Sequence, residues 1–443
     1  MKKLFYITLD LILSFFLIIL LIVIIIALKI HFKKIVLNNL FMISLTRDSV
    51  KATKKLNARK FLNNFFGHPG FKLTYVLNIN DQCSNIITLG KDIIGIDKKI
   101  NIYFFLKQRL FISYFIIFEI YSIFVTVALM KKIKSNFIEL VTPGPIEFRA
   151  IIIKFITNCH ILAQVRGNID LLSYSIDKYF YFRVSRKILL VKIISLFFHR
   201  LVSELFYSNC SLVIGYNKNN LDSAISNGAD PKNSRLLRIE IHEQYKKENY
   251  NNNNYFLNDF PESNNNILVW SRLSKEKLID EIIKGFLIAA NNINDLNLII
   301  IGSGPEEENL KKIANFSNHS KRIYFLGYKD RNYISEAAKK SLFTIISFGG
   351  STLVEAALFK LPIIAFDIEW HSELIRNDET GYLVDYSDPY HLSEKIIKSV
   401  NDNNKLKSMA ENCYYSVKKM FSHSNYLENK KRYMKILINK KIN

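Results

Sequence analysis

The sequence predicts an α/β protein in which two doubly wound domains follow an apolar N-terminal helix. The chain has 443 residues, more than one ordinary domain needs. After residue 70, short β-branched runs alternate with helical patterns, and this alternation occurs on both sides of an Asn-rich stretch. A long apolar run precedes all of these elements. Together the three observations give the order anchor, domain, linker, domain.

The apolar run is long enough to cross a membrane. From Leu11 to Leu28 every residue is apolar except Ser14, and about 18 to 20 such residues in a helix span the hydrocarbon core of a bilayer. The run is longer than the apolar part of a cleaved signal peptide, and its end lacks the small residues of a cleavage site. We therefore expect residues 1–34 to form an uncleaved transmembrane anchor with its flank.

Basic residues after the run predict its orientation. Nine lysines and arginines lie from Lys29 to Lys60, against the single acid Asp48. By the positive-inside rule, this excess places the bulk of the chain in the cytoplasm, behind a single N-terminal span. Residues 35–70 would then form a basic juxtamembrane segment that anionic lipid headgroups attract. A solvated basic helix is the alternative interpretation.

The first doubly wound domain is expected over residues 71–244. A second apolar stretch, from Leu110 to Met130, contains Glu119 near its middle. Because a charge at the bilayer centre is costly, we assign this stretch to a long, mostly buried helix rather than to a second span. The expected strands are Lys72–Leu77, Ile93–Ile96, Ile100–Phe105, Phe137–Val141, His160–Val165, Ser211–Tyr216 and Leu236–Ile241, and the expected helices are 107–134, 145–158, 172–208 and 218–227.

An Asn-rich stretch over residues 245–266 separates the two domains and is typical of a linker. The second doubly wound domain is expected over 267–400, and a basic tail over 401–443 is expected to form two or more helices. The expected strands are Ile267–Ser271, Leu296–Ile301, Arg322–Leu326, Phe343–Ser347, Pro362–Phe366 and Gly381–Val384, and the expected helices are 276–291, 305–316, 330–340, 351–360 and 371–377.

The composition excludes several classes of protein. Hydrophobic residues make up 49% of the chain and charged residues 23%, which excludes intrinsic disorder. The four cysteines lie far apart, so we expect neither a disulfide framework nor a structural zinc site. The net charge is +22, but the basic residues are scattered or juxtamembrane and no nucleic-acid-binding motif is present. We therefore expect no nucleic-acid partner and attribute the surplus to an anionic membrane surface.

Four strand-to-helix connections of the second domain carry residues suited to a nucleotide, and ligands of parallel sheets bind at such connections. After its first strand, Arg272 and Lys277 could neutralise a diphosphate, or they could be surface charges at a helix start. After the second, Gly302 and Gly304 could let a backbone approach a ligand or make a plain tight turn. After the third, Tyr328 could border a planar base or be half buried in a turn.

The fourth connection, from Ser347 to Ala357, is the strongest of the four. A strand ends in two glycines and small hydroxyl residues, and a helix begins. The backbone N–H groups and the dipole of that helix could hold a phosphate, and Glu355 could accept hydrogen bonds from a ribose diol. Capping by Ser351 or Thr352 would explain the same residues without a ligand, but four such connections in fixed order favour the ligand.

The order of these motifs resembles the nucleotide-sugar-binding half of a GT-B glycosyltransferase. Arg-Leu-x-x-Glu-Lys, Gly-x-Gly-Pro, Phe-Leu-Gly-Tyr and Gly-Gly-x-x-x-x-Glu-Ala-x-x-x-x-x-Pro-Ile-Ile-Ala follow one another over about 265–390. They are most similar to the group-1 transferases of glycosyltransferase family 4. The ending from Phe421 to Tyr433 is also similar to that family, in which a terminal helix crosses back to the first domain. The resemblance implies two Rossmann-like domains that face a cleft.

The resemblance also implies roles for the residues that match. Arg272 and Lys277 would bind the donor diphosphate and stabilise the charge of the leaving nucleotide. Glu355 would bind the donor ribose, and Tyr328 would border the base. Neither a metal nor a cofactor is implied, because the two cations can do the work of a metal. The rest of the donor-binding set consists of Gly302, Gly304, Ser347, Gly349, Gly350, Ser351, Thr352 and Leu353.

Two positions depart from the family pattern. The family usually has a second glutamate eight positions before Glu355, in contact with the donor sugar, and this chain has Ser347 there. Arg166 stands where the family has the His of a His-Gly pair. The Gly-Gly-Ser-Thr stretch is also similar to inverting GT-B enzymes with lipid-linked acceptors, but we favour a retaining, metal-independent hexosyltransferase. On the acceptor side, strand-end positions suggest Gly144, Arg166 and Asn168.

The motifs and the anchor together predict a membrane-anchored glycosyltransferase. It would move a sugar from a nucleotide-diphosphate donor to a lipid-linked or growing glycan acceptor, in the assembly of a surface polysaccharide such as lipopolysaccharide. One alternative is a catalytically silent GT-B scaffold of a membrane polysaccharide complex, which the two departures favour. The other is a nucleotide-sugar epimerase of the same fold, which would need no anchor.

Overall fold

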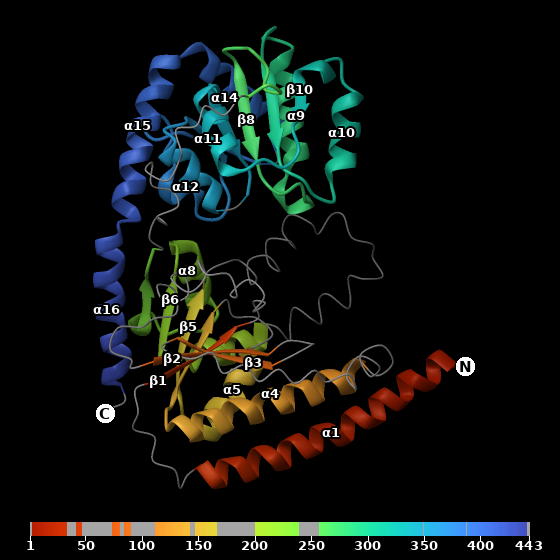
Figure 1. Ribbon diagram of the computed structural model, residues 1–443, viewed down its shortest axis with the longest axis vertical. Helices are drawn as coiled ribbons and strands as arrows, with labels where there is room; N and C mark the ends of the chain where they lie inside the picture. The colour runs from red at the N-terminus through yellow and green to blue at the C-terminus, as the bar shows by residue number, and fades with distance from the viewer. Residues whose placement is uncertain are drawn as a thin grey trace. The chain divides into compact units, whose positions relative to one another are not determined.

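The computed structural model describes residues 2–32, 41–46, 73–79, 84–89, 111–141, 147–165, 200–238, 257–348, 350–386 and 388–440. The chain divides into two compact units. Unit 1 comprises Met1–Arg238 and Tyr426–Asn443, and unit 2 comprises Ile239–Asn425. Each unit is built around its own sheet (Figure 1).

Unit 1 contains a seven-stranded sheet in the order β3-β2-β1-β4-β5-β6-β7. All neighbouring strands are parallel except β2 and β3. Its strands are β1 Phe41–Thr46, β2 Leu73–Ile79, β3 Ser84–Leu89, β4 Phe137–Val141, β5 His160–Val165, β6 Leu212–Gly215 and β7 Ser234–Leu236. The strands predicted over 137–141 and 160–165 are confirmed, whereas those predicted over 93–96 and 100–105 lie outside the described residues.

Strand β1 is the main difference from the sequence prediction in this unit. It lies within 35–70, where we expected only a basic juxtamembrane segment, yet it pairs with β2 and β4 in the middle of the sheet. Met42 and Ile43 are fully buried. The expectation for 35–70 is corrected here. The six residues of β1 are typical of a strand, but they precede a stretch rich in lysine and arginine. We interpreted the whole segment from its charge and therefore missed the strand.

Helices α1 (Lys2–Phe32), α4 (Phe111–Ile133) and α5 (Glu147–Thr157) pack against one another in unit 1. Figure 1 shows α1 in red alongside α4 in orange. Leu21 of α1 is buried in one hydrophobic cluster with Ile123 of α4 and Ile153 of α5. The helix predicted over 110–130 is therefore confirmed, and most of its described residues from Ile123 onward are buried. Within the described side chains no helix meets the length and hydropathy of a membrane span, so the predicted transmembrane span is not confirmed.

The C-terminal helix α16 (His423–Asn439) belongs to unit 1 rather than to unit 2. Met434 is fully buried in a cluster with Phe137 of β4. The hydroxyl group of Tyr433 donates a hydrogen bond to the carbonyl oxygen of Leu236, at 3.1 Å. The chain thus returns to the first domain at its end, as the family resemblance implied. Helix α8 (Lys218–Ser226) likewise matches the helix predicted over 218–227.

Unit 2 contains a six-stranded parallel sheet in the order β10-β9-β8-β11-β12-β13. The chain starts at β8, continues outward through β9 and β10, and then returns to β11 on the other side of β8. The strand order therefore reverses between β8 and β11, and ligands of such sheets bind beyond the carboxyl ends of the strands at this reversal. The strands are β8 Asn266–Trp270, β9 Asn297–Ile301, β10 Ile323–Phe325, β11 Phe343–Ile346, β12 Ile363–Phe366 and β13 Tyr382–Val384, which confirms all six predicted strands.

The helices of unit 2 follow its strands in alternation. In one example, the Asp330 carboxylate accepts a hydrogen bond from the backbone N–H of Tyr333 and so caps the first turn of α11. The helices are α9 Ile279–Ala290, α10 Glu307–Asn315, α11 Arg331–Lys339, α12 Gly350–Leu358, α13 His371–Leu374, α14 Pro389–Asn401 and α15 Asn403–Met420.

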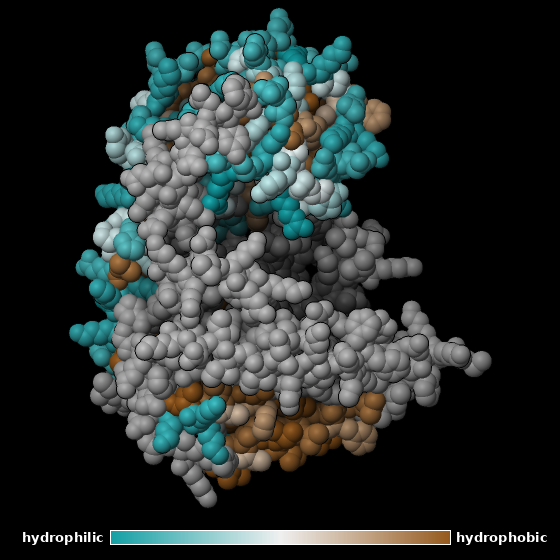
Figure 2. All heavy atoms as spheres, in the orientation of Figure 1, coloured by the Kyte–Doolittle hydropathy of each residue, from teal (hydrophilic) through white to brown (hydrophobic). Residues whose placement is uncertain are grey.

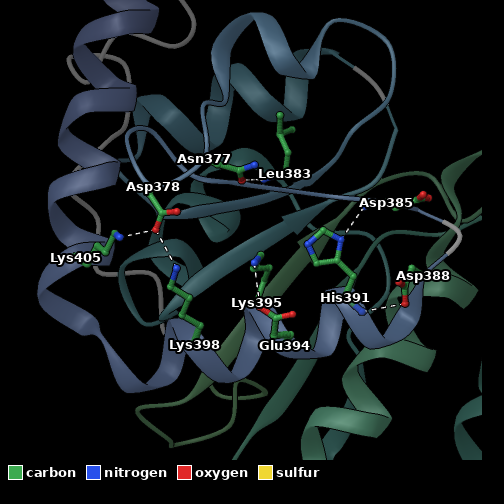
Figure 3. Close-up of polar contacts among 10 residues, drawn as sticks. All are labelled: Asn377, Asp378, Leu383, Asp385, Asp388, His391, Glu394, Lys395, Lys398 and Lys405. Atoms are coloured by element: carbon green, nitrogen blue, oxygen red, sulfur yellow. Dashed lines mark hydrogen bonds and ion pairs between the residues drawn. The ribbon is translucent and has the colours of Figure 1, made fainter.

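Ion pairs and a helix cap fasten the last helices of unit 2 to the sheet (Figure 3). Asp378 lies before β13 and pairs with Lys405 of α15 and, at 2.9 Å, with Lys398 of α14. These two lysines hold the pKa of the Asp378 carboxyl below its usual value. Asp388 accepts hydrogen bonds from two backbone N–H groups at the start of α14. Part of the basic surplus of the tail therefore has a structural use.

Candidate functional site

The connection after β8 is joined to the connection after β11. Lys277 lies in the 3-10 turn Lys275–Lys277, and its ammonium group donates a hydrogen bond to the carbonyl oxygen of Phe348 at 2.8 Å. The carbonyl oxygen of Lys277 in turn accepts a hydrogen bond from the Ser347 hydroxyl group. The structure therefore brings Lys277 and Ser347 together at the reversal of strand order, where the sequence predicted a diphosphate.

Arg272 lies on the same connection with its side chain exposed. The residues on each side of it are held by β9 and its connection, because the N–H of Ser271 bonds to the carbonyl oxygen of Ile301 and the N–H of Leu273 bonds to that of Ser303, both at 3.0 Å. Leu273 is also buried. The backbone is thus fixed while the guanidinium group faces solvent, as a group that receives a charged ligand must.

Glu355 is held by two residues that sequence reasoning missed. The indole N–H of Trp270, the last residue of β8, donates a hydrogen bond to Oε2 of Glu355 at 3.0 Å. The Arg331 guanidinium group, at the start of α11, lies 3.3 Å from Oε1. Glu355 is only 9% exposed, so these partners satisfy a carboxylate that is costly to bury alone. The position of Trp270 two residues before Arg272 was the only sequence signal for this contact.

Gly302 and Gly304 are required by packing. Gly302 has a φ of +142°, and a Cβ atom there would overlap the carbonyl oxygen of Ser271. A Cβ atom on Gly304 would overlap the carbonyl oxygen of Leu273. The two glycines therefore let the β9 connection lie directly on the β8 connection. This packing of backbone on backbone accounts for both glycines, and neither sequence interpretation of Gly-x-Gly had named it.

The connection after β10 lies against the connection after β9. The N–H of Gly302 donates a hydrogen bond to the carbonyl oxygen of Gly327 at 2.8 Å. Gly327 has a φ of +67°, in the left-handed region that favours glycine. Tyr328 follows and is 79% exposed, so its ring is open to a planar partner rather than half buried in a turn.

Helix α12 starts at Gly350, one residue earlier than predicted. Ser351 is exposed, Thr352 is half-buried and Leu353 is fully buried in the core of unit 2. Leu353 could therefore contribute its backbone N–H to a phosphate, but not its side chain. Gly349 lies outside the described residues, as do the three acceptor-side candidates Gly144, Arg166 and Asn168.

Glu369 is a further titratable residue at this end of the sheet. It follows β12, adopts a left-handed φ of +52° and is half-buried. Burial raises the pKa of its carboxyl group to about 7, while the positive charge of Lys277 acts in the opposite direction. No motif marked Glu369 in the sequence, because burial beside a cation depends on the fold. Among the described residues, no group of three or more His, Cys, Asp or Glu side chains could hold a metal ion.

Comparison with known families identifies most of unit 2. Residues 252–415 match the family model described as glycosyl transferases group 1. This region is a group-1 glycosyltransferase domain. The match covers all four nucleotide-binding connections predicted from the sequence and confirms the family resemblance.

Several curated relatives align with part of the chain. An uncharacterized glycosyltransferase of Methanocaldococcus jannaschii is 29% identical over 38% of this chain and 44% of its own length. The poly(glycerol-phosphate) alpha-glucosyltransferase of Bacillus subtilis is 27% identical over 37% of this chain and 24% of its own. The alignments therefore span less than half of these relatives.

Solved structures resemble nearly the whole chain. A glycosyltransferase from Rickettsia africae has a TM-score of 0.58 at 14% identity and covers 90% of this chain and 99% of its own. Anabaena HepE in complex with UDP-glucose has a TM-score of 0.56 at 13% identity and covers 89% of this chain and 99% of its own. At these identities the likeness shows the fold alone, which is the predicted GT-B fold of two Rossmann-like units.

Proposed function

We propose that the protein is a glycosyltransferase that moves a sugar from a nucleotide-diphosphate donor to a lipid-linked or growing glycan acceptor in surface polysaccharide assembly. The observation that supports the proposal is that Arg272 and Lys277 follow β8 while Glu355 lies in α12, after the neighbouring strand β11, at the reversal of strand order in a group-1 domain. A donor needs two kinds of group there, cations for its diphosphate and a carboxylate for its ribose, and this end of the sheet supplies both.

The donor would bind with its diphosphate beside the two cations. Lys277 and Arg272 would stabilise the negative charge that develops on the nucleotide as the glycosidic bond to the sugar breaks. The backbone N–H groups at the start of α12 would add donors to the phosphates. Glu355 would accept hydrogen bonds from the ribose diol, and Tyr328 would border the base. Because the two cations would neutralise the diphosphate, a metal is not needed for that role, and we propose a metal-independent transferase. We also propose that it retains the anomeric configuration.

The names of relatives support the donor and acceptor classes. HepE was solved with UDP-glucose, which supports a UDP-sugar donor. The Bacillus relative is named for a poly(glycerol-phosphate) acceptor. The lipopolysaccharide outer core galactosyltransferase WaaB has a TM-score of 0.53. A phosphate-bearing or lipid-linked glycan acceptor agrees with the net charge of +22, and the apolar helix α1 would hold the enzyme at the cytoplasmic face of a membrane that carries such an acceptor.

A donor screen on the purified protein tests this proposal. Binding of UDP-, GDP- and ADP-sugars would be measured by calorimetry for the wild type, Glu355→Ala and Arg272→Ala, with Lys312→Ala of α10 as the control for a surface cation elsewhere in unit 2. We expect one nucleotide class to bind, and the two site variants, but not the control, to weaken it at least tenfold. Binding of no donor, or binding untouched by both site variants, would contradict the proposal.

A catalytically silent scaffold is the second candidate, and the environment of Ser347 favours it. Its hydroxyl group bonds to the Lys277 carbonyl oxygen, so this residue supports the loop where the family has a sugar-contacting glutamate. A scaffold would bind donor without turnover. Release of nucleotide from the donor above background, abolished by Lys277→Met, would exclude it. Formation of an epimerised nucleotide sugar in the absence of acceptor would instead favour an epimerase.

A further inference from the structure

Helix α1 has two sides with different surroundings. Leu21 is buried in the core of unit 1, and Ile25 and Leu28 pack beside it. On the opposite side, Phe16, Val23 and Ile30 are 63%, 57% and 61% exposed. Because these three residues are spaced by seven, they form one stripe along the helix. One long side of α1 is therefore in contact with protein, and the other is apolar and uncovered.

The exposed apolar surface extends beyond this stripe. Ten of the described large hydrophobic side chains of α1 are exposed, and Phe148 and Phe155 of the neighbouring helix α5 are exposed as well, at 44% and 53%. Figure 2 shows hydrophobic side chains gathered in one area at the bottom of the view, where Figure 1 draws α1. Monomeric soluble proteins rarely expose a large continuous apolar patch, and where such a patch occurs it usually marks an interaction site.

The described charges that α1, α4 and α5 expose beside this surface are of one sign. Among the described side chains of α1, α4 and α5, the charged residues that are not buried are all lysines, and the Lys134 side chain is exposed directly after α4. The ammonium group of Lys29 lies 3.4 Å from the centroid of the Phe155 ring. Lys131 and Lys132 end α4, and Figure 1 shows the C-terminal ends of α1 and α4 at the same end of the pair. The apolar face therefore has a basic edge.

We propose that the apolar face of unit 1 docks on an anionic lipid bilayer, with α1 lying in the plane of the interface rather than crossing the membrane. The proposal deepens the membrane attachment proposed above and rests on it. Because α1 is packed lengthwise on α4 and α5, a crossing orientation would carry these helices and their sheet toward the hydrocarbon core. An in-plane orientation instead sinks only the exposed stripe below the headgroups and leaves the lysines level with them.

The charge of the edge favours lipid over a second copy of the chain. Two copies that joined through this face would bring their lysines near one another, and like charges at an interface are unfavourable. Anionic headgroups would instead neutralise the lysines. The described side chains of the stripe, Phe16, Val23 and Ile30, also carry no polar group that could make a hydrogen bond across a protein interface.

Depth measurement along the exposed stripe separates the two orientations. Single cysteines would replace Phe16, Val23 and Ile30 in the full chain and be labelled with a fluorophore. Cys83 would be changed to Ser, while Cys159, Cys210 and Cys413 stay because they are buried. Lipid-borne quenchers at known depths would then be compared in vesicles of phosphatidylcholine and phosphatidylglycerol. We expect one common shallow depth at all three positions, and no quenching of Phe316→Cys, an exposed aromatic position of unit 2.

A crossing helix gives a different pattern, because seven residues rise about 10 Å along a helix axis. Depths that differ by about that amount from one position to the next would overturn the in-plane proposal. Absence of quenching, together with protection of the labels that increases with protein concentration, would overturn it in favour of a second copy. The measurement uses no donor, so its failure would leave the proposed glycosyl transfer untouched, and failure of the donor screen would not affect the depths.

Lysine substitutions test the basic edge separately. Lys132→Gln and Lys134→Gln should each weaken binding to the anionic vesicles about fivefold, whereas Lys312→Gln and Lys321→Gln, two exposed lysines of unit 2, should leave it unchanged. Equal binding to anionic and to pure phosphatidylcholine vesicles would contradict the role of the lysines in this proposal.

Discussion

Replacement of Trp270 by Phe tests how the donor site is held together. The substitution keeps an aromatic ring at the end of β8 but removes the indole N–H that donates to Glu355 at 3.0 Å. A hydrogen bond to a charged group contributes about 1.5–3 kcal/mol, and Glu355 is too buried for water to replace it fully. The remaining partner, Arg331, lies at 3.3 Å and has a side chain that is 41% exposed, so it compensates little.

We expect two measurable effects of Trp270→Phe. The free energy of unfolding should fall by about 3 kcal/mol, which combines the lost hydrogen bond with the smaller ring in a buried site. Affinity for the donor nucleotide should fall about tenfold, equivalent to about 1.4 kcal/mol, because Glu355 is no longer aimed at the ribose. Urea unfolding measures the first effect and titration calorimetry with UDP the second.

A nucleotide without the ribose diol provides the decisive control. A 2′,3′-dideoxy analogue of UDP cannot bond to Glu355 through its ribose, so wild type and Trp270→Phe should bind it equally. In a double-mutant cycle, Glu355→Gln and Trp270→Phe should show a coupling energy of about 1–2 kcal/mol. An equal loss of affinity for UDP and for the analogue would refute the positioning role, as would a variant that binds UDP like the wild type.

Three further predictions concern the same end of the sheet. Lys277→Met should lower kcat for transfer by about 10²- to 10³-fold, and Lys312→Met should not; a change in KM alone would contradict a role in charge stabilisation. Because the folded-state pKa of Glu369 is raised to about 7, the folded protein binds more protons than the unfolded chain between about pH 4.5 and 7, so stability should fall as pH rises through this window. Glu369→Gln should remove up to about 3 kcal/mol of that fall, and parallel unfolding profiles for variant and wild type would contradict the assignment. Gly302→Ala should cost more than about 3 kcal/mol in urea unfolding, since its Cβ atom meets backbone, whereas Gly327→Ala, which meets nothing within 4 Å, should cost only about 1 kcal/mol of backbone strain; equal losses would show that the contact does not matter.

The fold could be predicted because parallel sheets repeat a local pattern. Each strand of unit 2 is a short, mostly apolar run that ends in a polar or glycine-containing connection, and all six were found in this way. Strand β1 was missed, because its six residues stand before a basic stretch whose charge suggested another use. The residues on the exposed side of α1 could not be predicted either, because α1 is apolar on every side and periodicity does not distinguish one side from another.

The residues of the candidate site could be predicted only where a single strand-to-helix connection contains the motif that marks them. Lys277, Arg272 and Glu355 each lie beside a strand end and could be named from the sequence. Trp270 could not, because it meets Glu355 across 85 residues of chain, and only the parallel order β8–β11 makes them neighbours. Glu369 was missed for the same reason, since its environment is created by burial beside Lys277, a residue of another connection.

Transfer of a labelled sugar tests the central claim most directly. The donor selected by the binding screen would be labelled in its sugar and incubated with the full-length protein and membranes that supply acceptor lipid, and incorporation into the lipid or glycan fraction would be measured over time. We predict incorporation by the wild type, loss of at least 100-fold in both Lys277→Met and Glu355→Ala, and unchanged incorporation in Lys312→Met. Donor that binds but is never transferred to any membrane acceptor, or incorporation that persists in both site variants, would contradict the account.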